Sequence, residues 1–115
     1  MHEMGVVMAA CDQIIAFAEE NNISEIAEIV FAIGEGSGVF EPYVRKVYPA
    51  VVKDTMLEKT ELVIETVPGM AECLDCFEIY NVLENEGKCP ECGSKMKEIL
   101  SGTEFAIKEI HVPED

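Results

Sequence analysis

Four cysteines in the second half of the chain have the spacing of a metal site. Cys73 and Cys76 are separated by two residues, Cys89 and Cys92 likewise, and twelve residues lie between the two pairs. Two such C-x-x-C turns can place four thiolates in a tetrahedron at about 2.3 Å from one zinc ion. Because that coordination sphere is closed to water and substrate, we expect a structural zinc ion that contributes to folding.

Two other chemistries use the same cysteine spacing. Redox pairs or disulfides fit less well, because neither pair begins a helix in a strand–helix–strand context and no secretory signal is readable. A single iron ion is a stronger alternative to zinc. The run Cys89-Pro-Glu-Cys92-Gly93 has the form of the cysteine turns (knuckles) that hold iron in rubredoxin-like sites. The first pair lacks that form, so the sequence favours zinc and leaves iron open.

The first three residues form a second group of possible metal ligands. A bulky second residue such as His2 is expected to leave Met1 in place, so the chain would offer an amine, an amide nitrogen and an imidazole. Glu3 adds a further amide nitrogen and a carboxylate. Nitrogen-rich tetragonal ligation suits Ni(II) or Cu(II), although short terminal motifs also match by chance, and from these residues alone a terminus without function is the stronger interpretation.

Two other residues with metal-binding or nucleophilic side chains are predicted to have structural roles. His111 is far along the chain from both cysteine pairs and is predicted to be an ordinary strand residue. Cys11 lies within an apolar stripe of helical period, where a lone cysteine is more often a small core residue than a nucleophile.

The ligand groups must be positioned by the regular elements around them. Apolar residues that recur from Met4 at intervals of three and four predict a helix of about 17 residues that stops at Asn21-Asn22. Segments rich in β-branched residues predict three strands, and a glycine-rich turn follows the first of them. These predicted strands are Ile26–Ile33, Glu61–Val67 and Glu104–Val112.

A second helix is predicted between the first two strands, over Val39–Lys53. Pro42 suits its first turn, whereas Pro49 is expected to kink or break it. Tyr43, Val47 and Val51 form its apolar stripe, and Val44 and Tyr48 flank that stripe.

The order of elements predicts an α+β fold. A strand–helix–strand unit favours a crossover that places both strands in one sheet, and two helices can cover only one sheet face. We therefore expect two helices packed on a small three-stranded mixed sheet, formed by residues 1–69 plus 101–115 and carrying the nickel site. Residues 70–100 are expected to form an inserted, zinc-ribbon-like, zinc-binding subdomain.

Composition limits the possible partners. The chain has 115 residues, of which 49% are hydrophobic, so a modest core is possible. Its net charge is −15, and Arg45-Lys46 is the single adjacent basic pair, which argues against nucleic acid and anionic membranes as partners. No apolar stretch reaches the roughly 18 residues of a membrane span. We expect a soluble, cytoplasmic protein, a monomer or weak dimer, that meets cations or basic protein surfaces.

Taken together, these motifs resemble the HypA/HybF family of nickel-incorporation proteins for hydrogenase and, in some organisms, urease. The resemblance spans essentially the whole chain. Besides the two cysteine pairs, the residues that carry it are Met1-His2-Glu3, Ile33-Gly34-Glu35, Val67-Pro68 and Ser101-Gly102-Thr103-Glu104.

The resemblance implies a nickel metallochaperone in hydrogenase maturation and not an enzyme. It implies His2 as the essential nickel ligand, the Met1 amine as a second ligand, and Glu3 as a ligand or a partner-facing group. It also implies structural zinc on the four cysteines, and as partners the GTPase HypB and the hydrogenase large subunit.

Other functions remain open from the residues alone. A zinc-ribbon module for protein or nucleic-acid interaction would usually expose basic residues near its knuckles, whereas here three lysines lie among more numerous glutamates. A rubredoxin-like electron carrier would require iron. An enzyme is disfavoured, because no nucleophile–base pair, phosphate-binding loop or open metal triad is readable.

Overall fold

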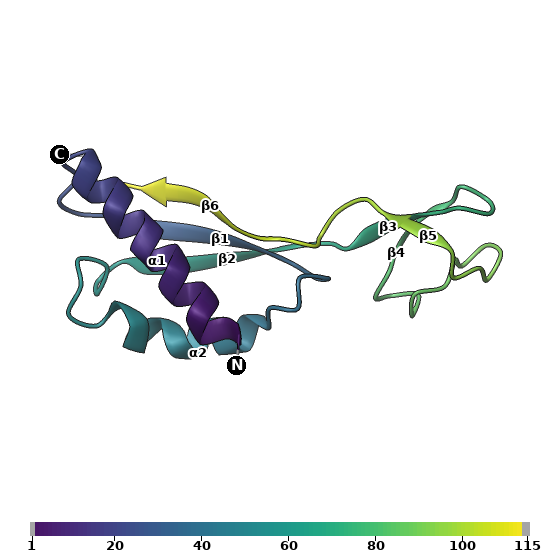
Figure 1. The fold of residues 1–115 in the computed structure, drawn as a ribbon, viewed down its shortest axis with the longest axis horizontal. Coiled ribbons are helices and arrows are strands. Elements are labelled where there is room, and N and C mark those ends of the chain that lie inside the picture. The colour runs from purple at the N-terminus through teal and green to yellow at the C-terminus, as the bar shows by residue number, and fades with distance from the viewer. Residues whose placement is uncertain (1, 114–115) are drawn as a thin grey trace.

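The computed structural model describes residues 2–113, without the side chain of His2, as an elongated molecule of 54 × 29 × 19 Å. Two lobes lie end to end (Figure 1). The larger lobe contains both helices and one three-stranded sheet, and the smaller lobe contains a second three-stranded sheet. The predicted fold class, two helices on a small mixed sheet with an inserted zinc-ribbon-like unit, is confirmed.

Helix α1, His2–Glu20, begins slightly earlier than predicted and ends close to the predicted Asn21-Asn22. Its buried face includes Val7, Ile14 and Ala18, which recur at the spacing of an amphipathic helix. Cys11 lies on the same face, and burial, with a smaller effect of Asp12, raises the pKa of its thiol to about 11. Cys11 therefore belongs to the core, as predicted.

Helix α2, Glu41–Val52, contains Pro42 in its first turn as predicted. Pro49 does not break the helix, which continues for three more residues; the expectation of a break there is wrong. The buried stripe is Val44, Tyr48 and Val52, rotated by one residue from the predicted one. Pro49 lacks only its own N–H, so one intrahelical hydrogen bond is lost, and the Tyr48 hydroxyl, donating to the Thr60 carbonyl at 3.1 Å, helps to hold that turn.

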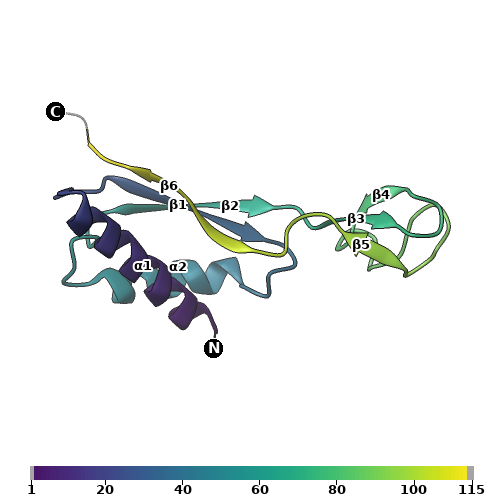
Figure 2. The same cartoon turned by 45° about the horizontal axis from the view of Figure 1, so that its top comes forward.

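The sheet of the larger lobe has the order β2-β1-β6. Strand β1, Glu28–Gly34, is parallel to β2, Glu61–Val67, and antiparallel to β6, Phe105–His111. Both helices lie on the same side of this sheet (Figure 2). Over the other face an ion pair joins Lys108 Nζ to Glu65 Oε1 at 2.5 Å, with both side chains about half exposed, so this face is partly open.

The sheet of the smaller lobe is antiparallel with the order β4-β3-β5. These strands are short and were not predicted: β3 is Met70–Cys73, β4 is Ile79–Asn81 and β5 is Lys97–Ile99. The lobe has a small buried cluster, of which Ala71 and Tyr80 are the non-cysteine members. So little apolar burial requires another source of folding free energy.

Neither helix in the described part of the chain is long and apolar enough to cross a bilayer.

Candidate metal sites

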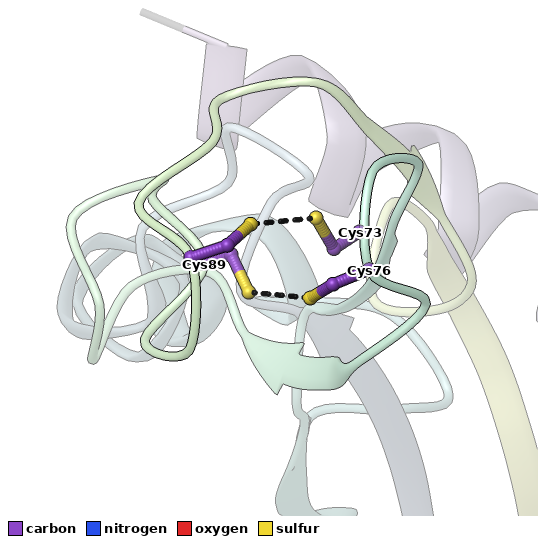
Figure 3. A group of neighbouring side chains, drawn as sticks. Cys73, Cys76 and Cys89 are labelled. Carbon is purple, nitrogen blue, oxygen red and sulfur yellow. Dashed lines mark hydrogen bonds between the residues drawn. The ribbon is translucent and has the colours of Figure 1, made fainter.

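The four cysteine sulfurs of the smaller lobe meet at one point. All four Sγ atoms of Cys73, Cys76, Cys89 and Cys92 lie within 4.8 Å of one another. Two contacts, Cys73 to Cys92 and Cys76 to Cys89, measure 3.5 Å each, and Figure 3 shows how Cys73, Cys76 and Cys89 point toward one another. Four thiolates at about 2.3 Å from a zinc ion stand about 3.8 Å apart. The observed spacing therefore fits a tetrahedral metal site.

Each cysteine pair is shaped by the same backbone hydrogen bonds. The N–H of Asp75 points at Cys73 Sγ and the N–H of Glu91 at Cys89 Sγ, both at 3.4 Å. Backbone N–H groups directed at sulfur favour the thiolate, which is the form that binds metal. The side chains of Ser94 and Asp75 are hydrogen-bonded to each other and join the two knuckles.

The residue after each pair closes the knuckle in a left-handed conformation. Gly93 has φ 78°, and its N–H donates to the Cys89 carbonyl at 2.8 Å. Phe77 has φ 66° and makes the equivalent bond to the Cys73 carbonyl at 2.9 Å. A bulky residue is rarely found in this conformation, so the first knuckle is strained where the second is not.

The proximity of the sulfurs prevents all four from ionising without a cation. Hydrogen bonding from the Cys76 N–H, and more weakly from the Asp75 N–H, lowers the pKa of Cys73 to about 7. For Cys76 a backbone N–H from Glu78 opposes the sulfur contact with Cys89 and desolvation, and the net effect raises its pKa to about 12. A divalent ion would replace the remaining protons and balance the thiolate charge.

The four cysteines differ in their exposure to solvent. Cys73 and Cys89 are buried in the lobe, whereas Cys76 and Cys92 are exposed at its surface. Four protein ligands leave no coordination position for chemistry, so this arrangement is that of a structural site able to hold a metal such as zinc.

The start of α1 lies in the other lobe, well separated in Figure 1 from strands β3, β4 and β5. Met1 and the side chain of His2 lie outside the described residues. Glu3 is 5% exposed, and its Oε2 accepts the N–H of Phe40 at 3.0 Å, just before α2. Its carboxylate therefore anchors the first turn of α1, a contact that no local sequence pattern indicated.

His111 lies in β6 on the larger lobe, away from the cysteines, as expected for an ordinary strand residue. Its Nε2 is 2.7 Å from Glu109 Oε1 and 3.8 Å from Glu28 Oε1. The His111 ring thus has carboxylate neighbours on the surface of the larger lobe and needs no metal to explain its position.

Comparison with known proteins gives consistent matches along the chain. Residues 1–112 match the family model described as "Hydrogenase/urease nickel incorporation, metallochaperone, hypA". The chain is 31% identical over 112 residues to the hydrogenase maturation factor HypA of Albidiferax ferrireducens, covering 97% of this chain and 99% of that protein. It is 33% identical over 113 residues to HypA of Streptomyces avermitilis, covering 96% and 86%.

The fold is also found in a solved structure. The solution structure of the Ni metallochaperone HypA from Helicobacter pylori superimposes with a TM-score of 0.66. The two chains share 23% identity, and the match covers 98% of each.

Proposed function

The chain belongs to the HypA family of hydrogenase and urease nickel-incorporation metallochaperones, which are not enzymes, and from this premise we propose that it binds Ni(II) at its N-terminus and delivers it during hydrogenase maturation. The observation that carries the proposal is the match of residues 1–112 to the nickel-incorporation family, and it is supported by the start of α1 at His2, which makes the first residues part of a helix N-terminus.

A helix N-terminus suits nickel bound through amide nitrogen. The first N–H groups of a helix have no intrahelical acceptor, so the amides of His2 and Glu3 are not needed to hold α1 together. When a metal displaces their protons, the resulting negative charge is favoured by the helix dipole. With the Met1 amine and the His2 imidazole, these atoms supply the nitrogen-rich ligation that Ni(II) prefers.

Glu3 supports this site through its position. Its carboxylate accepts the Phe40 N–H, which anchors the first turn of α1 to the segment before α2. We assign Glu3 as a nickel ligand through its amide nitrogen and as the residue that fixes the backbone on which Met1 and His2 stand.

In the smaller lobe we propose that Cys73, Cys76, Cys89 and Cys92 hold structural zinc. The sulfur spacing and the backbone N–H groups directed at sulfur support this assignment. We accordingly assign the nickel site to residues 1–69 plus 101–115 and the zinc site to residues 70–100. The zinc supplies folding free energy that the small apolar cluster of that lobe lacks.

Delivery follows from the difference between the two sites. A partner can replace the few ligands of a terminal nickel site one at a time, whereas a closed tetrathiolate retains its ion. We propose the GTPase HypB and the hydrogenase large subunit as the partners. We also propose the cytoplasm as the compartment, because all five free cysteines, including the four proposed zinc ligands, stay reduced there.

Metal stoichiometry on protein with its native first residue tests the proposal. We expect one nickel and one zinc per wild-type chain, and for His2→Ala no nickel with zinc retained. His111→Ala is the matched control, because His111 lies in β6 and should leave both metals unchanged. Nickel binding that survives His2→Ala would refute the assignment, and loss of zinc in that variant would show that the two sites are not separate.

A further inference from the structure

The connection between the two lobes is braced by a third segment of chain. The chain crosses to the smaller lobe near Pro68-Gly69 and returns near Ser101-Gly102 (Figure 1). The two crossings are joined to each other by Ser101, whose Oγ donates to the Pro68 carbonyl at 2.9 Å and accepts the Met70 N–H at 3.3 Å. The loop that follows β1, residues 35–40, lies against both of them and adds contacts to each.

The loop begins in a fixed position because its backbone is packed between the crossings. The Glu35 N–H donates to the Val67 carbonyl at 2.9 Å, and the Gly36 N–H donates to the Gly102 carbonyl at 2.7 Å. A Cβ on Gly34 would stand 2.2 Å from the Gly102 oxygen, so glycine is required for this approach. The Glu35 side chain is therefore placed by rigid backbone.

The Glu35 carboxylate bridges the lobes. Its Oε1 accepts the Gly69 N–H at 2.9 Å, within the first crossing, and Asn81 Nδ2 at 3.1 Å, from β4 of the smaller lobe. Hydrogen bonds to a carboxylate are stronger than those between neutral groups. They also lower the pKa of Glu35, the Gly69 bond most, so the group is ionised at neutral pH.

The same loop ends at the proposed nickel site. Within it, the Ser37 N–H bonds the Gly34 carbonyl at 3.0 Å and the Val39 N–H bonds Ser37 Oγ at 3.2 Å, which gives the loop a defined shape. At its far end the Phe40 N–H is the donor to Glu3. Six residues thus connect the Glu35 bridge to the carboxylate that anchors the start of α1.

We propose that Glu35 is a positioning residue that clamps the smaller lobe to the larger one and, through loop 35–40, stabilises the hydrogen bond between Phe40 and Glu3. The zinc lobe is then a support for the N-terminal site as well as a separate unit. The consequence for nickel rests on the proposed function, whereas the clamp itself does not.

The clamp can be tested by exchanging the roles of the two side chains, so that residue 81 carries the acceptor and residue 35 the donor. Asn81→Asp places a carboxylate opposite Glu35 while keeping the Oδ1 that accepts the Glu84 N–H, so the clamp should open without loss of that turn. Adding Glu35→Gln to Asn81→Asp supplies a side-chain donor again and should restore the contact. Glu25→Ala is the control. Glu25 is an exposed glutamate like Glu35, but it lies before the start of β1 and outside loop 35–40, so its removal should leave the clamp intact.

The readout is measured on zinc-loaded, nickel-free protein. In Asn81→Asp we expect hydrogen exchange of the Phe40 amide to accelerate about fivefold, as for one lost hydrogen bond, and the lobes to lose their common alignment in residual dipolar couplings. The double variant should return both quantities to the wild-type range. Unchanged exchange and alignment in Asn81→Asp, or a double variant no better than the single one, would overturn the clamp.

Nickel affinity then tests the functional consequence. We expect it to fall about fivefold in Asn81→Asp and to recover in the double variant, in parallel with the Phe40 exchange rate. An affinity that stays constant while the exchange rate changes would overturn the link between clamp and nickel site. A wild-type chain that binds no nickel at its N-terminus would refute the proposed function and leave the exchange results to decide on the clamp.

Discussion

The strained first knuckle predicts a substitution that stabilises the protein. Phe77 has φ 66° at the position where the second knuckle has Gly93 with φ 78°. Phe77→Gly removes the strain and sacrifices little burial, because the side chain is 70% exposed. Gly93→Ala is the reverse experiment in the same fold.

The magnitude follows from the cost of left-handed backbone. For a residue with a Cβ, the left-handed conformation costs roughly 1–2 kcal/mol of folding free energy. Replacing it by glycine removes this cost but adds about 0.5–1 kcal/mol, because glycine has more conformational freedom to lose when the chain folds. We therefore expect Phe77→Gly to raise the free energy of unfolding of the smaller lobe by about 1 kcal/mol. Gly93→Ala should lower it by about 1 kcal/mol, and since a Cβ there meets nothing within 4 Å, that loss is purely conformational.

Urea unfolding of zinc-loaded protein, followed by release of zinc to a chromogenic chelator, measures both changes. The Phe77→Gly midpoint should rise with an unchanged slope, and the Gly93→Ala midpoint should fall. A fall for Phe77→Gly comparable to that for Gly93→Ala would refute the argument, because it would mean that the Phe77 side chain contributes more to stability than its backbone costs.

Three further outcomes follow from the structure. The buried Tyr80 hydroxyl has no hydrogen-bond partner among the described residues, so Tyr80→Phe should leave the free energy of unfolding unchanged or raise it by about 1 kcal/mol, and a clear loss in urea unfolding would contradict this. The pKa of Glu35 is lowered mainly by the Gly69 N–H, so its contribution to stability is complete above the usual carboxyl pKa and is lost as pH falls through the lowered value; NMR titration of the Gly69 amide should show this transition, and its persistence in Glu35→Ala would disprove the assignment. Removal of zinc by a chelator should unfold the smaller lobe while amides of β1 stay protected from hydrogen exchange, and loss of that protection would show that the larger lobe also depends on the metal.

Local sequence patterns predicted the elements whose signal is strong and continuous. The apolar period of α1 and the β-branched run of β1 each extend over several residues, and the two cysteine pairs define a site by spacing alone. The strands of the smaller lobe are only three or four residues long, too short for a period to emerge. The break expected at Pro49 is absent because the contact that holds this end of α2, from the Tyr48 hydroxyl to the Thr60 carbonyl, joins residues twelve positions apart and leaves no local signal.

The contacts that join distant segments were not predictable in this way. Glu35 meets Asn81 across 46 positions of sequence, and Glu3 meets Phe40 across 37. In each contact a glutamate carboxylate accepts a hydrogen bond from an amide N–H, and the residues next to the glutamate in sequence give no indication of which amide that is. Such contacts arise from tertiary packing; Glu35, for example, directly follows Gly34, whose backbone lies against Gly102.

Equilibrium dialysis against Ni(II) of chains with and without one extra residue before Met1 tests the central claim most directly. The extension displaces the terminal amine from the start of α1 and leaves the cysteines untouched. Our account predicts about one nickel per native chain, little or none on the extended chain, and equal zinc on both. Equal nickel on the two proteins would contradict it.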